Sequence, residues 1–444
     1  MVLGQKDRSN RMLIDDAAQK EGSEVDDDYP SISKQLRRYF SIAHWCLLFP
    51  VDGVTKEDGH DVRFSWTSNA TIFSLLSLVI SSFSFLAVVS QVLKDNVNYY
   101  RYANSLISSL VSVLLKVVFL MQARHWPAMI KQWASVERKL KPLFEDLSKH
   151  EKSVGDYNMI MNVYLAATLI LIVTHYLLSL ELALQCSESF FEVFNLTIAE
   201  AYFDMYSATS FSLWKAIIPT VLHVQERLIW MLMDLYVILL SRSICSYFVR
   251  INQRLIKVQH KSMPTSFWLF MRESYNSVTF LTKQLDSHLA WMNLYCFGSP
   301  LFFITSAILE TFSAKSVLKG VADLYKLVYV IGRFIITSHS ASALHDESKV
   351  PVQILFSVPA ESYNTEVARF QTQTLHCDTA LTGCNYFSIT RSFMLTVAGT
   401  IVTYEVILLQ FGSVEFYYRA KNMTEACNIL LTTIYSGDSR IASN

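Results

Sequence analysis

The last long hydrophobic segment of this chain closes with Thr403-Tyr404-Glu405-Val406-Ile407-Leu408-Leu409-Gln410-Phe411. Reading back from Gln410, polar or small residues recur at Thr403, at Thr400 or Gly399, and at Thr396. These steps of three, four and seven place them on one face of a helix. Because lipid cannot satisfy polar groups, the stripe either faces water or packs against a partner helix. The stretch therefore predicts a membrane helix with either a water-facing side or a polar packing seam.

The composition around this segment indicates a multi-pass membrane protein. Hydrophobic residues make up 52% of the 444 residues and gather in long segments. The formal net charge is zero, so no bulk attraction to nucleic acid is implied. The first thirty residues are polar and acidic without an apolar core, so we expect no cleavable signal peptide.

Hydropathy predicts seven membrane spans and an all-α fold. The predicted spans are 71–93, 104–122, 158–184, 217–241, 289–310, 321–343 and 390–411. Glu226 and Arg227 interrupt the fourth span, and its hydrophobic face continues to Phe248. We interpret that span as a long helix that protrudes from the bilayer.

The distribution of basic residues predicts the orientation of the spans. The loops after spans two and four each carry seven Lys or Arg residues, whereas the loop after span three carries none across 185–214. Basic loops stay in the cytoplasm, so the N-terminus is predicted inside and the C-terminus outside. A glycosylation sequon at Asn195 and another at Asn422 would then be extracellular. A G-protein-coupled receptor has the opposite orientation, so no G protein is expected as a partner.

The seven cysteines show no metal-ligand spacing and no CxxC motif. Five of them would face lipid, protein core or cytosol. Only Cys186 and Cys427 could meet outside the cell, where a disulfide would persist.

Several segments together resemble a known family. Thr403-Tyr404, five mostly apolar residues and Gln410-Phe411 resemble the C-terminal signature of insect gustatory receptors. The run from Ser392 to Glu405 resembles their sugar-receptor branch in particular. Further segments of that branch are similar, in the same order, to Phe49-Pro50-Val51-Asp52-Gly53-Val54, His345-Asp346-Glu347-Ser348-Lys349 and Ala380-Leu381-Thr382-Gly383. The resemblance runs from about residue 40 to residue 411.

The resemblance implies a ligand-gated cation channel for sweet taste. It implies four subunits, homomeric or formed with related receptors, in the plasma membrane of a sensory neuron dendrite. Its partners would be a small sugar, monovalent and divalent cations, and the lipid bilayer. Two other readings stay open: a channel of the same superfamily gated by a non-sugar tastant, and a multi-pass small-molecule transporter.

The implied organisation divides the chain into five parts. These are a cytoplasmic N-terminal segment (1–70), helices one to six with an extracellular-side ligand pocket (71–343), a cytoplasmic anchor segment (344–389), the pore helix (390–411) and an extracellular tail (412–444). Amphipathic stretches from Trp126 to Leu143 and from Tyr247 to Val258 would join the anchor, or lie on the inner leaflet. We expect a helix from Glu366 to Thr382 and a turn at His345-Asp346.

Ionisable and aromatic residues of the outer half are the candidate ligand contacts. A neutral polyol needs carboxylates for paired hydroxyls and aromatic faces for the ring. The candidates are Glu181, His223, Trp230, Asp234, Glu310, Tyr325 and Tyr329. The alternative is structural: Asp234 would pair with Arg333 across the bundle, and Trp230 and Tyr325 would be core or interfacial aromatics.

By the same resemblance, the last span lines a central pore. The candidate pore residues are Thr400, Thr403, Ile407, Gln410 and Phe411. An apolar ring can close a pore by dewetting, while hydroxyls and amides line it when open. Glu405 lies away from this face and is expected to pair with another helix.

The sequence does not indicate an enzyme. We find no GxSxG, HExxH or Walker motif and no paired-carboxylate constellation. No cofactor and no metal is therefore expected.

Overall fold

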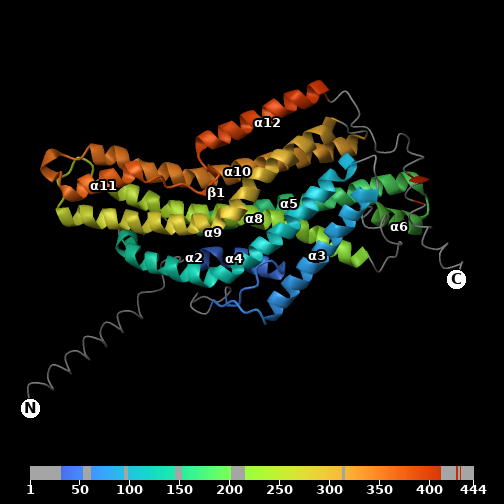
Figure 1. The fold of residues 1–444 in the computed structure, drawn as a ribbon, viewed down its shortest axis with the longest axis horizontal. Helices are drawn as coiled ribbons and strands as arrows, with labels where there is room; N and C mark the ends of the chain where they lie inside the picture. The colour runs from blue at the N-terminus through green and yellow to red at the C-terminus, as the bar shows by residue number, and fades with distance from the viewer. Residues whose placement is uncertain are drawn as a thin grey trace, which may run out of the picture.

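The protein is an elongated bundle of long helices (Figure 1). The computed structural model describes residues 32–53, 62–94, 99–145, 153–201, 216–312, 316–411, 427–428 and 431. The elements are α2 (Ile32–Trp45), α3 (Asn69–Lys94), α4 (Tyr99–Glu145), α5 (Ser153–Cys186), α6 (Phe190–Ala201), α8 (Ile217–Lys257), α9 (Thr265–Phe312), α10 (Val317–Phe356), η3 (Ala360–Ser362), α11 (Thr365–His376), β1 (Thr382–Gly383), β2 (Phe387–Ser388) and α12 (Arg391–Phe411). The expected sequon at Asn422 and nearly all of the 412–444 tail lie outside the described residues.

Among the described residues, six helices are long and apolar enough to cross a membrane: α3, α4, α5, α8, α9 and α10. They contain the first six predicted spans. Several are much longer than a bilayer requires: α4 has 47 residues, or about 70 Å at 1.5 Å per residue. The predicted seventh span corresponds to α12, a helix of 21 residues. The prediction of an all-helical membrane protein is confirmed, and α8 continues well beyond its predicted span.

Helix α8 lies at the centre of the bundle. Every residue from Ile229 to Ser241 is buried, so this part of the helix is apolar nearly all round and needs neighbours on every side. Helices α9 and α10 pack along α8, and α4, α5 and α2 also contact it. Tyr39 of α2 donates a hydrogen bond to the carbonyl of Leu232 at 3.0 Å.

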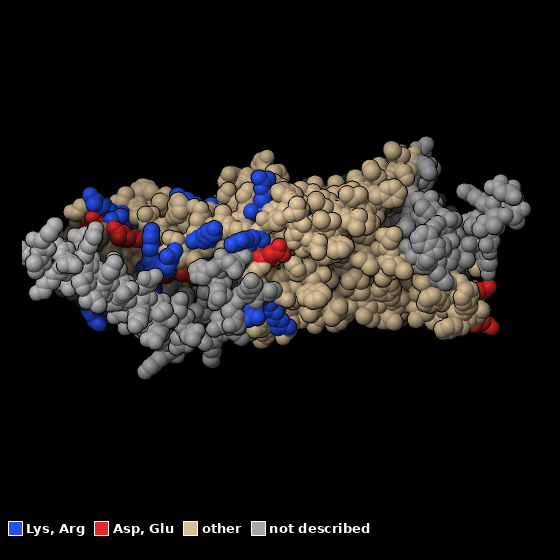
Figure 2. Space-filling model, turned by 90° about the horizontal axis from the view of Figure 1, so that it is seen from below, with Lys and Arg blue, Asp and Glu red and all other residues tan. Residues whose placement is uncertain are grey.

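Charge is distributed unevenly along the bundle. Lys and Arg side chains gather over the end that carries α11, and an uncharged band follows toward the end that carries α6 (Figures 1 and 2). Helix α3 lies in this part of the bundle (Figure 1), and its apolar side chains Ile72, Leu76 and Phe83 are exposed. An apolar band of this kind suits a lipid environment. We call the two ends the α11 end and the α6 end.

Two local predictions near the α11 end are wrong. The expected turn at His345-Asp346 lies inside α10, which continues to Phe356. Hydropathy falls there, but Leu344, Ser348 and Leu355 keep a buried face in register, so the helix is held by packing.

The expected helix from Glu366 to Thr382 is also shorter than predicted. Helix α11 begins after Asn364, whose side chain accepts hydrogen bonds from the backbone N–H groups of Glu366 and Val367. It ends at His376, and Cys377 is extended. A hairpin of β1 and β2 then leads into α12.

Candidate ligand site and pore helix

Arg333 of α10 is the centre of a polar cluster in the bundle. Its guanidinium pairs with the Asp234 carboxylate of α8 and donates to the carbonyl oxygen of Trp230 at 3.3 Å. The guanidinium carbon also lies 5.7 Å from the Trp230 ring centroid and 5.5 Å from that of Tyr329. The sulfur of Cys296 on α9 lies 3.6 Å from Oδ1 of Asp234. Asp234 therefore pairs with Arg333 across the bundle, which is the structural alternative considered from the sequence.

The two tyrosines of α10 extend this cluster toward α5. The Tyr329 hydroxyl lies 2.9 Å from the Thr168 hydroxyl. The Tyr325 hydroxyl donates to the carbonyl oxygen of Ala167 at 2.9 Å. Both rings are therefore oriented by α5, and a movement of α10 against α5 would break these bonds.

Glu310 belongs to a second, half-exposed cluster. Lys326 of α10 binds its Oε2 at 2.7 Å, and the amide of Asn104 on α4 donates to its Oε1 at 2.8 Å. Ser306 in turn donates to Asn104 at 2.8 Å. Three helices meet here through side chains whose charge is balanced. Unlike Asp234, Glu310 keeps about a third of its side chain exposed.

His223 and Glu181 contact further residues. The His223 ring centroid is 4.3 Å from that of His175, and Arg227 donates to His223 at 3.4 Å. Glu181 accepts a hydrogen bond from Ser316 at 3.2 Å, and Ser316 is the N-cap of α10.

The structure thus brings Trp230, Asp234 and Tyr329 together around one arginine. Sequence reasoning placed Arg333 only as a pairing partner, and it named neither Thr168, which bonds Tyr329, nor Asn104, which bonds Glu310. The charge of Arg333 at membrane depth was the signal that could have identified it as a candidate site residue. Asn104 and Thr168 are neutral, and nothing in their local sequence distinguishes them.

The predicted pore residues lie on one side of α12. Thr400, Thr403 and Ile407 are separated by helical steps, and Ile407 is 41% exposed. The hydroxyl groups of Thr400 and Thr403 donate to the carbonyls of Thr396 and Gly399 on their own helix. Gln410 and Phe411 end the helix, and their side chains, like that of Glu405, lie outside the described residues.

Helix α12 stands apart from the bundle over most of its length (Figure 1). Its first turns pack against α9 and α10, through Phe393 and Val397 among others. Farther along, Val402 and Tyr404 are exposed. Much of the helix is therefore open to lipid or to another chain.

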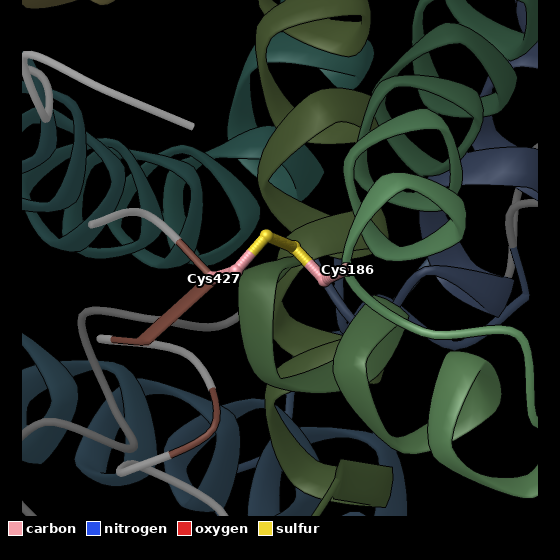
Figure 3. Close-up of a disulfide and its surroundings, with 2 residues drawn as sticks. All are labelled: Cys186 and Cys427. Carbon is pink, nitrogen blue, oxygen red and sulfur yellow. A yellow bond between two sulfur atoms is a disulfide. The ribbon is translucent and has the colours of Figure 1, made fainter. Parts of the chain in front are cut away.

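A disulfide joins Cys186 to Cys427 at the α6 end (Figure 3). Cys186 is the last residue of α5, and Cys427 belongs to the tail beyond α12. The pairing considered from the sequence is therefore present. The expected glycosylation site on Asn195 remains a prediction, and its side chain is only 9% exposed on α6, which argues against it.

Comparison with known sequences places the chain among taste receptors. The sequence profile of the trehalose receptor family matches residues 18–417. The gustatory receptor for sugar taste 64f of Drosophila melanogaster is 29% identical over 385 residues, which are 86% of this chain and 81% of that receptor. The gustatory receptor 5a for trehalose of the same species is 25% identical over 385 residues, covering 86% of this chain and 85% of that receptor.

Comparison with solved structures agrees with this at the level of fold. The insect olfactory receptor OR5 from Machilis hrabei, in complex with eugenol, superposes with a TM-score of 0.62 at 13% sequence identity. The match covers 87% of this chain and 100% of that receptor. The family profile spans most of the sequence, so the chain belongs to the trehalose receptor family, within the sugar branch of the insect gustatory receptors.

Proposed function

We propose that this gustatory receptor is a sugar-gated, non-selective cation channel that mediates sweet taste. In this proposal four subunits, identical or mixed with related receptors, lie in the plasma membrane of a sensory neuron dendrite. The α11 end faces the cytoplasm, which agrees with the Lys and Arg side chains gathered there (Figure 2). The names of the sugar taste and trehalose receptors support a sugar as the ligand.

The ligand site in this proposal lies among α4, α5, α8, α9 and α10 toward the α6 end. Trp230, Tyr325 and Tyr329 offer aromatic faces for the C–H face of a sugar ring. Glu310 and Asn104 offer a half-exposed acceptor and donor, which in this structure are joined to each other by a hydrogen bond of 2.8 Å. Further contacts would come from Glu181 and His223.

The observation that carries the proposal is the course of α10. One uninterrupted helix bears Tyr325, Tyr329 and Arg333 in the polar cluster and His345 to Lys349 at the junction before α12. At that junction Lys349 pairs with Asp378 at 2.7 Å, and His345 lies 3.3 Å from the carbonyl oxygen of Thr379. Arg391, the first residue of α12, pairs with Asp346. A shift of α10 at the ligand site is therefore transmitted to the residues that lead into α12.

In the gating step of this proposal, the sugar favours a state in which α12 moves outward. Ile407 and Phe411 form the apolar constriction of the closed pore, and Thr400, Thr403 and Gln410 line the open one. Sugar binding supplies the free energy of opening if the sugar binds the open state more tightly than the closed state, by a few kcal/mol summed over the subunits.

Whole-cell recording from cells that express this chain alone is the direct test, with mono- and disaccharides applied outside. A sugar-evoked cation current that is lost in a Gln410 variant supports the channel. Uptake of labelled sugar without matching current contradicts it and identifies a transporter. If the chain reaches the cell surface but gives no sugar-evoked current, it is co-expressed with related receptors. Absence of a sugar-evoked current there as well overturns the proposal.

A further inference from the structure

The junction between α11 and α12 is a compact hairpin. Thr382 pairs with Ser388 and Gly383 with Phe387, and the N–H of Tyr386 donates to the Gly383 carbonyl at 3.0 Å. Ile389 donates to the Leu381 carbonyl at 2.8 Å. Cys384 and Asn385 adopt positive φ angles of 50° and 61°, as the tight turn requires. The chain therefore enters α12 from a defined structure and not from a loose linker.

Helix α9 binds all the polar groups of one hairpin residue, Thr382. The Asp286 carboxylate accepts from the Thr382 backbone N–H through Oδ1 and from the Thr382 hydroxyl, 2.9 Å away, through Oδ2. Two turns along α9, the Asn293 amide donates to the Thr382 carbonyl at 2.9 Å. We call this set of three hydrogen bonds the Thr382 latch.

An aromatic contact continues the same face of α9 onto α12. Phe297, one turn after Asn293, lies against both Phe387 of the hairpin and Phe393 in the first turn of α12, with ring centroids 6.2 Å and 5.9 Å away. Phe387 and Phe393 stack on each other at 4.6 Å. The hairpin and the start of α12 thus form one unit on α9.

The latch holds the hairpin more strongly than the Arg391–Asp346 pair holds the start of α12. The Arg391–Asp346 pair with α10 is largely solvent-exposed, with Arg391 at 70%, and such pairs contribute little. In the latch, two hydrogen bonds reach one half-buried carboxylate, and bonds to a charged group are about twice as strong as neutral ones.

We propose that Asp286 is a positioning residue for gating, which holds the hairpin on α9 so that α12 follows the movement of the bundle. This inference rests on the proposed channel function and deepens it. Because the chain between His376 and Arg391 is not helical, the position of α12 depends on what holds the hairpin as well as on the packing of its own first turns. With the latch released, the ligand site still moves, but α12 follows it less closely, because only the Phe297–Phe393 contact and the contacts with α10 remain.

A double-mutant cycle tests the coupling. Asp286→Asn and Thr382→Val should each reduce the maximal sugar-evoked current or raise the half-maximal sugar concentration, by about tenfold for one lost charge-assisted hydrogen bond. The double variant should be no worse than the stronger single variant. Thr382→Ser keeps both donors and should behave as the wild type. Additive losses, unaffected single variants or an impaired Thr382→Ser would overturn the assignment at normal surface expression.

A readout independent of sugar separates this inference from the proposed function. Cys384 lies in the hairpin turn, and its labelling by a permeant maleimide can be followed by peptide mass spectrometry. Burial raises the pKa of the Cys384 thiol, and the Asp286 charge raises it further, so Thr382→Val is the cleaner variant because it keeps that charge. We expect Thr382→Val to label at least about threefold faster than Thr382→Ser, as expected for a lost hydrogen bond.

The outcomes of the two experiments are distinct. Normal labelling of Thr382→Val means that the latch does not hold the hairpin, and overturns the inference alone. A wild-type chain without sugar current under every subunit combination overturns the proposed function and the gating role with it. Faster labelling together with lost current supports both.

Discussion

Arg333 of α10 and Asp234 of α8 form an ion pair inside the helix bundle, with 16% and 4% of their side chains exposed. The same guanidinium reaches the Trp230 carbonyl at 3.3 Å. The Asp234 carboxylate is therefore engaged by a protein partner and is not a free acceptor. Its first role is to join two helices that both carry candidate ligand contacts, so removing it should affect folding as well as response.

The first prediction concerns this pair. Asp234→Asn leaves the Arg333 charge without its carboxylate, which destabilises buried pairs by about 3–5 kcal/mol. We expect a lower melting temperature in detergent and less protein at the cell surface. The double variant Asp234→Asn with Arg333→Gln should lose less than Asp234→Asn alone. An unchanged melting temperature with a shifted sugar response would instead assign the carboxylate to the ligand.

The second prediction separates Glu310 from Asp234. Glu310 is about a third exposed in its pair with Lys326, so Glu310→Gln should cost little stability. If Glu310 binds a sugar hydroxyl, the half-maximal sugar concentration should rise about tenfold, the scale of a hydrogen bond to a charged group. Glu188→Gln, at an exposed position near the same end, is the matched control. Equal dose–response curves for the two variants would remove Glu310 from the site.

Much of the fold could be predicted because hydrophobic length is a local signal. The first six predicted spans lie inside α3, α4, α5, α8, α9 and α10, and the seventh coincides with α12. The ends could not be predicted from hydropathy, because α10 continues past its apolar part by packing Leu344 and Ser348 against neighbours. Such packing depends on residues far away in the sequence.

The candidate site was harder to predict for the same reason. Sequence identified charged and aromatic residues at membrane depth, but not which of them meet. Arg333 satisfies Asp234 across 99 residues, and Asn104 meets Glu310 across 206. The Thr382 latch was not predicted: the segment from Ala380 to Gly383 was noted only for its resemblance to the family, and nothing near Thr382 in the sequence indicates Asp286 as its partner.

The third prediction concerns the disulfide. Cys186 and Cys427 are 241 residues apart, and closing a loop of this length destabilises the unfolded chain by about 5.5 kcal/mol in the entropic account. Cys186→Ser, Cys427→Ser and the double variant should therefore share one lowered melting temperature. Reducing agent should lower the melting temperature of the wild type to the same value and leave the melting temperatures of the variants unchanged. A further loss in the double variant would show that the cysteines act separately.

The fourth prediction concerns the closed pore. If Ile407 belongs to the apolar constriction, Ile407→Ser should wet it and raise the current measured without sugar. Val402→Ala changes an exposed residue on the opposite side of α12 and is the matched control. Both variants need equal surface expression for comparison. A normal basal current in Ile407→Ser, or an equal leak in the control, would remove Ile407 from the gate.

The fifth prediction concerns Gly383 in β1. A Cβ atom built there would lie 2.3 Å from the Phe387 ring, so Gly383→Ala must displace that ring from its stack on Phe393. Overpacking of this kind costs about 1–3 kcal/mol, and here it falls on the contact between hairpin and α12. We expect reduced maximal current with the half-maximal sugar concentration changed less. Gly332→Ala meets nothing within 4 Å and should leave the current intact. Adding Phe387→Leu to Gly383→Ala makes room for the new methyl group and should recover part of the stability lost. No recovery would mean that the defect arises elsewhere in the hairpin.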